Sequence, residues 1–225
     1  MESSSQLTLA VFVETNWVVD VVAPAHLQSP QAIQLLQSAD AGQLSIFVPA
    51  ICLTEARETV PRRFAPRSRS ADLRKFVQWA RTQGRLSTEE ATTAFKVFEQ
   101  FDNLVTQELT KVSERLAALK KHPGVNIFPL SESMLERQVV IGSMGLSLKP
   151  YDLAILAAIL SRAEELREAG YSEFAFCELD SDLQPWDRVG NRKPVLNSLY
   201  TDAQIRVYGD FLVRAADNFP NDWQE

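Results

Sequence analysis

Four short, continuously apolar runs constrain the fold of this chain more than any other feature. They cover residues 7–14, 45–49, 125–130 and 173–179, and Val, Ile or Phe occurs in each. Runs of this kind are typical of strands buried on both faces, as in a parallel sheet. Because helical patterns separate them, the sequence predicts an α/β fold in which helices cover both faces of a parallel sheet.

The helical patterns have recognisable starts and ends. Pro30 and Pro150 each suit a first helical turn, and Ser87-Thr88-Glu89-Glu90 is a capping box. We expect helices at residues 30–41, through Glu55 and Glu58 to just before Pro61, at 72–82, 87–121, 131–142, 150–170 and 201–217. A last strand is expected at residues 194–199.

The long helix from Ser87 carries a hydrophobic stripe from Phe98 to Leu119 at three- and four-residue steps. Packing against a neighbouring helix is the favoured interpretation, and a dimer seam is the alternative. The basic segment before it, RRFAPRSRS, has no apolar period, so we expect a mobile loop there.

Composition limits the classes of protein to consider. The chain has 225 residues and only two cysteines, Cys52 and Cys177, which lie in apolar surroundings. Small buried hydrophobes in a reducing compartment are expected, and the N-terminus MESSSQ lacks a basic signal region. No apolar run is suited to crossing a bilayer, so we predict a cytoplasmic protein without a membrane partner. The net charge of −6 disfavours a general nucleic-acid coat but permits a nuclease.

Acidic residues follow the strands or begin helices beside them. Glu14 ends the first strand, Glu55 lies one turn into the next helix, Asp152 follows Pro150, and Asp180 and Asp182 follow the fourth strand. Taken singly, most of them have ordinary explanations such as a helix cap or a surface charge. Because parallel strands place their carboxyl ends at one edge, we expect the acids together there, around Mg²⁺ or Mn²⁺.

Four segments resemble the motifs of PIN-domain nucleases: VFVETN, VPAICLTEA, PYDLAILAAIL and ELDSDL. The resemblance covers residues 7–60 and 125 to about 190. It implies a three-layer α/β/α sandwich with a mainly parallel sheet of about five strands, in a single domain over residues 1–225. Residues 61–122 would be a helical insertion, since this segment is much longer than in compact members of that family.

The resemblance also implies roles for residues. Glu14, Glu55, Asp152 and Asp180 would be catalytic, metal-binding acids with Asp182 as an accessory ligand, and Thr15 or Asn16 would orient the first acid. Three departures are visible. Glu14 stands where the family mostly has Asp, Glu178 where the fourth motif has Thr or Ser, and Leu183 where it has Phe.

The predicted function is a Mg²⁺- or Mn²⁺-dependent endoribonuclease acting on single-stranded RNA, with structured RNA or DNA as other substrates. The RNA backbone would be held by a basic group: Arg57, Arg62, Arg63, Arg67 and Arg69. Two alternatives stay open, a PIN-like binding module with little or no catalysis and a toprim-type phosphotransfer enzyme. A second copy of the chain and an antitoxin-like protein are the protein partners considered.

Overall fold

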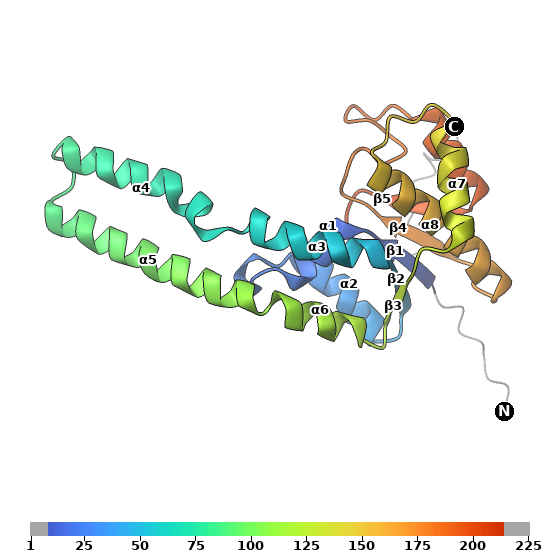
Figure 1. Ribbon diagram of the computed structural model, residues 1–225, viewed down its shortest axis with the longest axis horizontal. Coiled ribbons are helices and arrows are strands. Elements are labelled where there is room, and N and C mark those ends of the chain that lie inside the picture. The colour runs from blue at the N-terminus through green and yellow to red at the C-terminus, as the bar shows by residue number, and fades with distance from the viewer. Residues whose placement is uncertain (1–8, 214–225) are drawn as a thin grey trace.

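One five-stranded sheet organises the computed structural model, which describes residues 9–213 apart from the side chains of residues 67–69 (Figure 1). All neighbouring strands are parallel, in the order β3-β2-β1-β4-β5. The strands are β1 (Leu9–Val13), β2 (Leu44–Pro49), β3 (Val125–Phe128), β4 (Phe174–Cys177) and β5 (Ile205–Tyr208). The predicted α/β class, parallel sheet and number of strands are confirmed.

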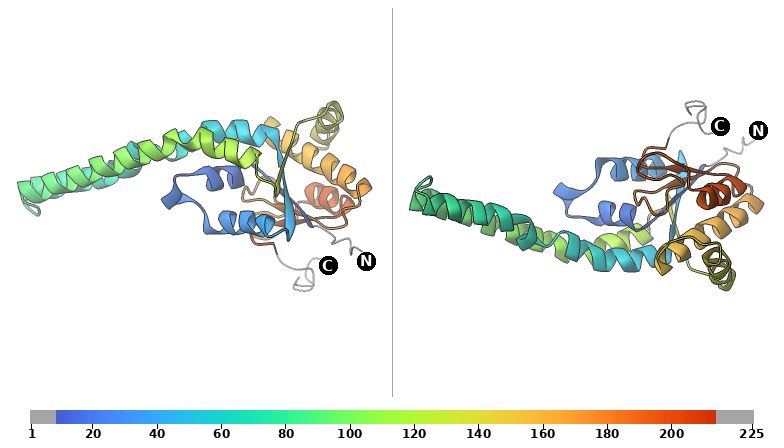
Figure 2. Two further views of the ribbon diagram at one scale, coloured as in Figure 1. Left: turned by 90° about the horizontal axis from the view of Figure 1, so that it is seen from below. Right: turned by 90° about the horizontal axis from the view of Figure 1, so that it is seen from above.

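Helices cover both faces of this sheet (Figure 2). On one face lie α1 (Thr15–Val22), α2 (Pro30–Asp40), α3 (Ala50–Arg63) and α6 (Val112–Lys120). On the other lie α7 (Glu132–Gly142), α8 (Pro150–Glu168) and α9 (Pro194–Asp202). The chain steps from β1 to β2 and β3, then returns across β1 to β4 and β5. The order of the strands thus reverses between β1 and β4, and ligands of such sheets usually bind outside the carboxyl ends of the strands at this switch point.

The double cover explains why the strands are apolar without alternation. Residues 10–13 of β1 and all of β4 are buried, as is the alanine-rich middle of α8 from Ala154 to Leu160. Trp17 of α1 is also fully buried, and its indole N–H donates to the backbone oxygen of Ala32 at 3.2 Å. This bond fixes α1 against α2.

The segment between α3 and α6 forms an arm of two antiparallel helices, α4 (Pro66–Thr82) and α5 (Thr88–Thr110), that projects from the rest of the molecule (Figure 1). The predicted capping box is confirmed, since Ser87 and Glu90 exchange both of its hydrogen bonds. Arg74 and Asp102 join the two helices with an ion pair of 2.7 Å. Arg74 also lies over the Phe98 ring, 5.4 Å from its centroid, so the stripe contacts α4 at its start, while Val112, Leu116 and Leu119 are buried in the main core.

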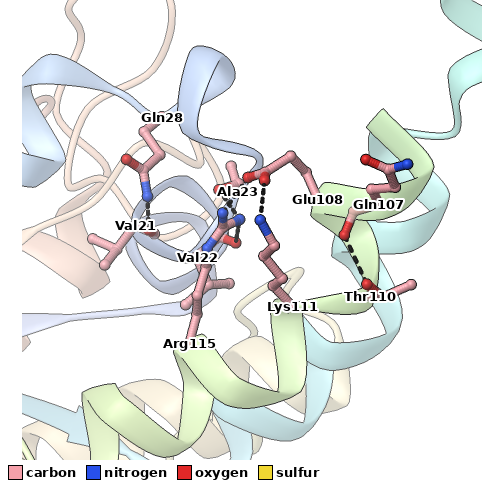
Figure 3. Close-up of polar contacts among 9 residues, drawn as sticks. All are labelled: Val21, Val22, Ala23, Gln28, Gln107, Glu108, Thr110, Lys111 and Arg115. Carbon is pink, nitrogen blue, oxygen red and sulfur yellow. Dashed lines mark hydrogen bonds and ion pairs between the residues drawn. The ribbon is translucent and has the colours of Figure 1, made fainter. Parts of the chain in front are cut away.

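The arm is anchored at its base by polar contacts (Figure 3). Arg115 of α6 donates to the backbone oxygen of Ala23 at 2.8 Å and also binds the Glu108 carboxylate. Lys111 donates to the same carboxylate at 2.7 Å. These hydrogen bonds from Lys111 and Arg115 lower the pKa of Glu108 to about 2, so the carboxylate stays ionised at physiological pH.

The predicted mobile loop at the basic segment is wrong. α3 continues through Pro61 to Arg63, and only Phe64 and Ala65 separate it from α4. Pro66 stands in the first turn of α4, where backbone N–H groups have no acceptor within the helix, so its missing N–H breaks no hydrogen bond. Phe64 is buried in the turn between the two helices. The single helix predicted for residues 87–121 is two helices, because the chain turns at Lys111.

The predictions for the end of the chain are also wrong. Residues 194–199 form part of α9 rather than a strand, because Pro194 begins a helix. The strand of this region is β5, and Gln204, at a φ of 53°, turns the chain into it. The predicted helix at 201–217 is therefore absent from the described residues 203–213, while 214–217 lie outside them.

Two shorter elements complete the fold. Residues 15–22, for which no element is predicted, form α1, and a 3₁₀ turn, η1, covers Ala25–Leu27. Within residues 9–213, no helix combines the length and the apolar character needed to cross a membrane.

Candidate functional site

Two buried carboxylates stand side by side at the carboxyl ends of β1 and β4. Val13 and Cys177 are register partners in the two strands, so the residues that follow them, Glu14 and Glu178, are neighbours. Glu14 is 5% exposed and Glu178 is 0% exposed. Two continuously apolar strands thus end in a pair of buried carboxyl groups.

Backbone hydrogen bonds hold one oxygen of each carboxylate. Asn16 donates its backbone N–H to Glu14 Oε1 at 2.8 Å, so Glu14 caps the start of α1. Asp180 donates its backbone N–H to Glu178 Oε1 in the same way. The other oxygen of Glu178, Oε2, is buried and has no hydrogen-bond partner. A buried carboxylate oxygen without a partner is costly, which makes this atom available to a ligand.

Burial and repulsion both favour protons on this pair. Burial raises the pKa of Glu14 to about 8, against the opposing hydrogen bonds from Asn16, and the Glu55 and Asp180 charges raise it further. Burial also raises the pKa of Glu178 well above its ordinary value, and repulsion from Glu14 adds to the effect. Near neutral pH the two side chains must keep protons or share a cation.

Two further acids approach the pair from neighbouring helices. Glu55 of α3 accepts a hydrogen bond of 2.6 Å from the Thr15 hydroxyl, which fixes its carboxylate beside the start of α1. Asp152 lies in the first turn of α8 and has a buried oxygen, Oδ2, without a hydrogen-bond partner. Burial raises the pKa of Asp152, Lys149 opposes this, and the charges of Asp180, Asp182 and Glu55 reinforce it.

The loop after β4 supplies the remaining acids and is itself held in place. Asp182 donates its backbone N–H to Asp180 Oδ1 at 2.9 Å, and its carboxylate lies 3.8 Å from Lys149 Nζ. Lys193 donates to the backbone oxygens of Ser181 and Asp182. The charges of Glu55 and Asp180 thus act on Glu14, and those of Asp180, Asp182 and Glu55 act on Asp152, so the five predicted acids form one connected cluster.

The donor set suits a hard divalent cation, because it consists of carboxylate oxygens. The unpartnered oxygens of Glu178 and Asp152 are the atoms with the most to gain from one. As the side chains stand, no three Asp, Glu, His or Cys residues among those described are arranged to hold a metal ion. Ligation by Glu14, Glu178 and Asp152 together would therefore require side-chain rotation.

Glu178 is a site residue that sequence reasoning missed, since it was taken only as a departure from a motif. A signal was present: it directly follows a buried strand, as Glu14 does. That β4 lies next to β1, which brings the two residues together, is decided by the sheet order.

The predicted basic group is divided among several places. Arg62 lines a cavity of about 190 Å³ that also includes Glu55. Arg57 lines a separate cavity of about 450 Å³, on the side of α3 that faces α6. Arg63 lies 3.4 Å from Asp20 in an ion pair. The side chains of Arg67 and Arg69 lie outside the described part of the chain, so of the five arginines Arg62 has the clearest connection to the acids.

Comparisons with known proteins identify no family for this chain. No family model, no curated protein and no solved structure matches it at a significant level.

Proposed function

We propose that this chain is a divalent-metal-dependent nuclease that hydrolyses the phosphodiester bonds of single-stranded RNA. The observation that carries the proposal is the buried pair Glu14 and Glu178, which ends adjacent strands at the switch point of the sheet. Two buried carboxylates destabilise the folded chain unless a proton or a cation neutralises them. As oxygen ligands of Mg²⁺ or Mn²⁺, the two carboxylates would be neutralised by the ion that they bind.

The residues would divide the work by position. Glu14, Glu178 and Asp152 would hold the ion, since burial gives their carboxylates the strongest demand for positive charge. Glu55, Asp180 and Asp182 would orient its water ligands from the rim. A bound Mg²⁺ or Mn²⁺ lowers the pKa of water and so supplies a hydroxide for attack on phosphorus. Thr15 would position Glu55, and the Asn16 backbone N–H would position Glu14.

RNA as the substrate comes from the resemblance of four segments to PIN-domain nucleases, and DNA is the other polymer with the same linkage. The cytoplasm is the proposed compartment, which agrees with two cysteines that are buried and unpaired.

A second candidate is a binding module on the same fold without catalysis. It is favoured by one observation, namely that no three described acids already surround a common point. In that case the buried pair would keep its protons, and RNA or a protein would bind without being cleaved.

The experiment compares Asp152→Asn and Asp180→Asn with the unchanged chain in manganese-dependent cleavage of labelled single-stranded RNA. Both variants should lose cleavage while circular dichroism and the melting temperature show an intact fold. Glu136→Gln, on the exposed surface of α7, serves as a matched control and should cleave normally. Titration calorimetry with Mn²⁺ decides between the two candidates, because the binding module predicts no heat of binding at millimolar metal.

A further inference from the structure

A small cavity lies beside the acidic site and shares one acid, Glu55, with it. Its volume is about 190 Å³, and six residues line it: Thr54, Glu55, Glu58, Thr59, Arg62 and Tyr151. Five of them belong to α3, whereas Tyr151 comes from the first turn of α8, directly before Asp152. Because Glu55 belongs to both the cavity and the acidic site, a group that fills the cavity lies next to the reacting phosphate of the proposed substrate.

The charges of the lining exclude a phosphate group as the occupant. Glu55 and Glu58 contribute two carboxylates against the single guanidinium of Arg62, so an anion would be repelled on balance. Carboxylates instead attract groups that present N–H donors, and a guanidinium attracts acceptor oxygen and nitrogen atoms. The occupant should therefore be a neutral group with donors on one edge and acceptors on another.

Two threonines and the aromatic ring of Tyr151 complete the lining. Tyr151 is 53% exposed, although it stands next to a partly buried acid, and large aromatic side chains usually bury most of their surface. Proteins that bind single-stranded RNA stack unpaired bases on exposed aromatic rings and read the base edges with polar side chains. Tyr151 is in place to provide the stacking surface, with Glu58 and Arg62 to contact the edges.

We infer that this cavity is a nucleobase subsite selective for guanine, in which the base stacks on Tyr151 between Glu58 and Arg62. Guanine carries two adjacent N–H donors, at N1 and the 2-amino group, which match the two oxygens of one carboxylate. It also carries two adjacent acceptors, O6 and N7, which match the fork of a guanidinium. Adenine lacks this pairing of donors, and the smaller pyrimidines offer less surface to the ring. The inference rests on the proposed function, since it assigns a sequence preference to the same site.

The test uses uridine decamers that differ at one internal position, which is guanosine, inosine or adenosine. Inosine lacks only the 2-amino group. With the unchanged chain, kcat/KM should be about tenfold or more higher for guanosine than for adenosine, with inosine between them. Tyr151→Ala should raise KM for the guanosine strand about 5- to 100-fold, whereas Tyr151→Phe, which keeps the ring, should not. Glu58→Gln should remove the preference for guanosine over inosine.

Controls separate this inference from the proposed function. Tyr151→Ala and Glu58→Gln should bind Mn²⁺ with unchanged affinity, because neither residue belongs to the proposed ligand set. Equal kcat/KM for all three strands, or an unchanged KM in Tyr151→Ala, would overturn the subsite while leaving the nuclease in place. If the unchanged chain cleaves none of the strands, the nuclease proposal fails, and fluorescence anisotropy with Ca²⁺ judges the subsite alone. Equal affinity for the guanosine and adenosine strands would then overturn it.

Discussion

Replacing Glu14 by Gln should stabilise the metal-free protein, and the gain should depend on pH. The pKa of Glu14 is raised in the folded chain from 4.5 to about 8. Because the pKa is raised, the contribution of Glu14 to folding stability is fully present below pH 4.5 and is lost as the pH rises toward 8. At pH 7, about 2.5 units above the unfolded pKa, the unfolded chain has released the Glu14 proton while the folded chain still holds it. This difference lowers the free energy of unfolding by about 3 kcal/mol. Gln carries no such proton, and its amide oxygen can still accept the hydrogen bond from Asn16.

The assay is thermal unfolding of Glu14→Gln and the unchanged chain in EDTA, at pH 4.5 and pH 7. For a chain of this length, about 3 kcal/mol corresponds to a rise in melting temperature of about 6–12 °C. The rise should occur at pH 7 and vanish at pH 4.5. Mn²⁺ at 100 times its dissociation constant should stabilise the unchanged chain by about 2.7 kcal/mol and Glu14→Gln by much less. The variant should thus be more stable and inactive.

Two results would refute this reasoning. If Glu14→Gln gains the same stability at both pH values, the gain has nothing to do with a proton on Glu14. If the variant is less stable at pH 7, Glu14 is ionised and satisfied by a partner in the folded chain, contrary to its burial beside Glu178. Glu136→Gln, at an exposed position, should show no change at either pH.

The remaining predictions concern the arm and a close backbone contact. Arg115→Ala should lower the free energy of unfolding by about 1–3 kcal/mol and speed limited proteolysis at the base of the arm, because the Ala23 carbonyl loses its donor and Glu108 keeps only Lys111. The exposed Arg81→Ala should do neither. Gly124→Ala should cost about 1–3 kcal/mol in chemical denaturation, since its Cβ would stand 2.7 Å from the Cβ of Ala39. By contrast, Gly142→Ala meets no atom closer than 3.8 Å at the end of α7 and should be neutral or stabilising by up to about 1 kcal/mol.

Local sequence patterns identified secondary structure correctly where the apolar residues of the pattern are also the buried ones. Continuous apolar runs identified β1 to β4, and the capping box at Ser87 identified the start of α5. They failed where polar composition was equated with a loop. The basic segment is helical because Pro66 suits a first turn and Phe64 is buried, although the surrounding arginines give no periodic signal.

The acids at strand ends and helix starts could be named from the sequence, since parallel strands share one carboxyl edge. Their distances could not, and neither could the role of Glu178. A motif comparison treats that residue as a substitution, whereas the sheet order makes it the direct neighbour of Glu14.

The sequence by itself thus determined the type of sheet and which carboxylates reach its edge, because strand and helix patterns depend on neighbours along the chain. Only the tertiary structure decided that β4 lies beside β1, that Glu14 and Glu178 are buried together, and that Tyr151 shares a cavity with Arg62. These relations join residues far apart in the chain, and they follow from the order in which the strands associate, which no local pattern specifies.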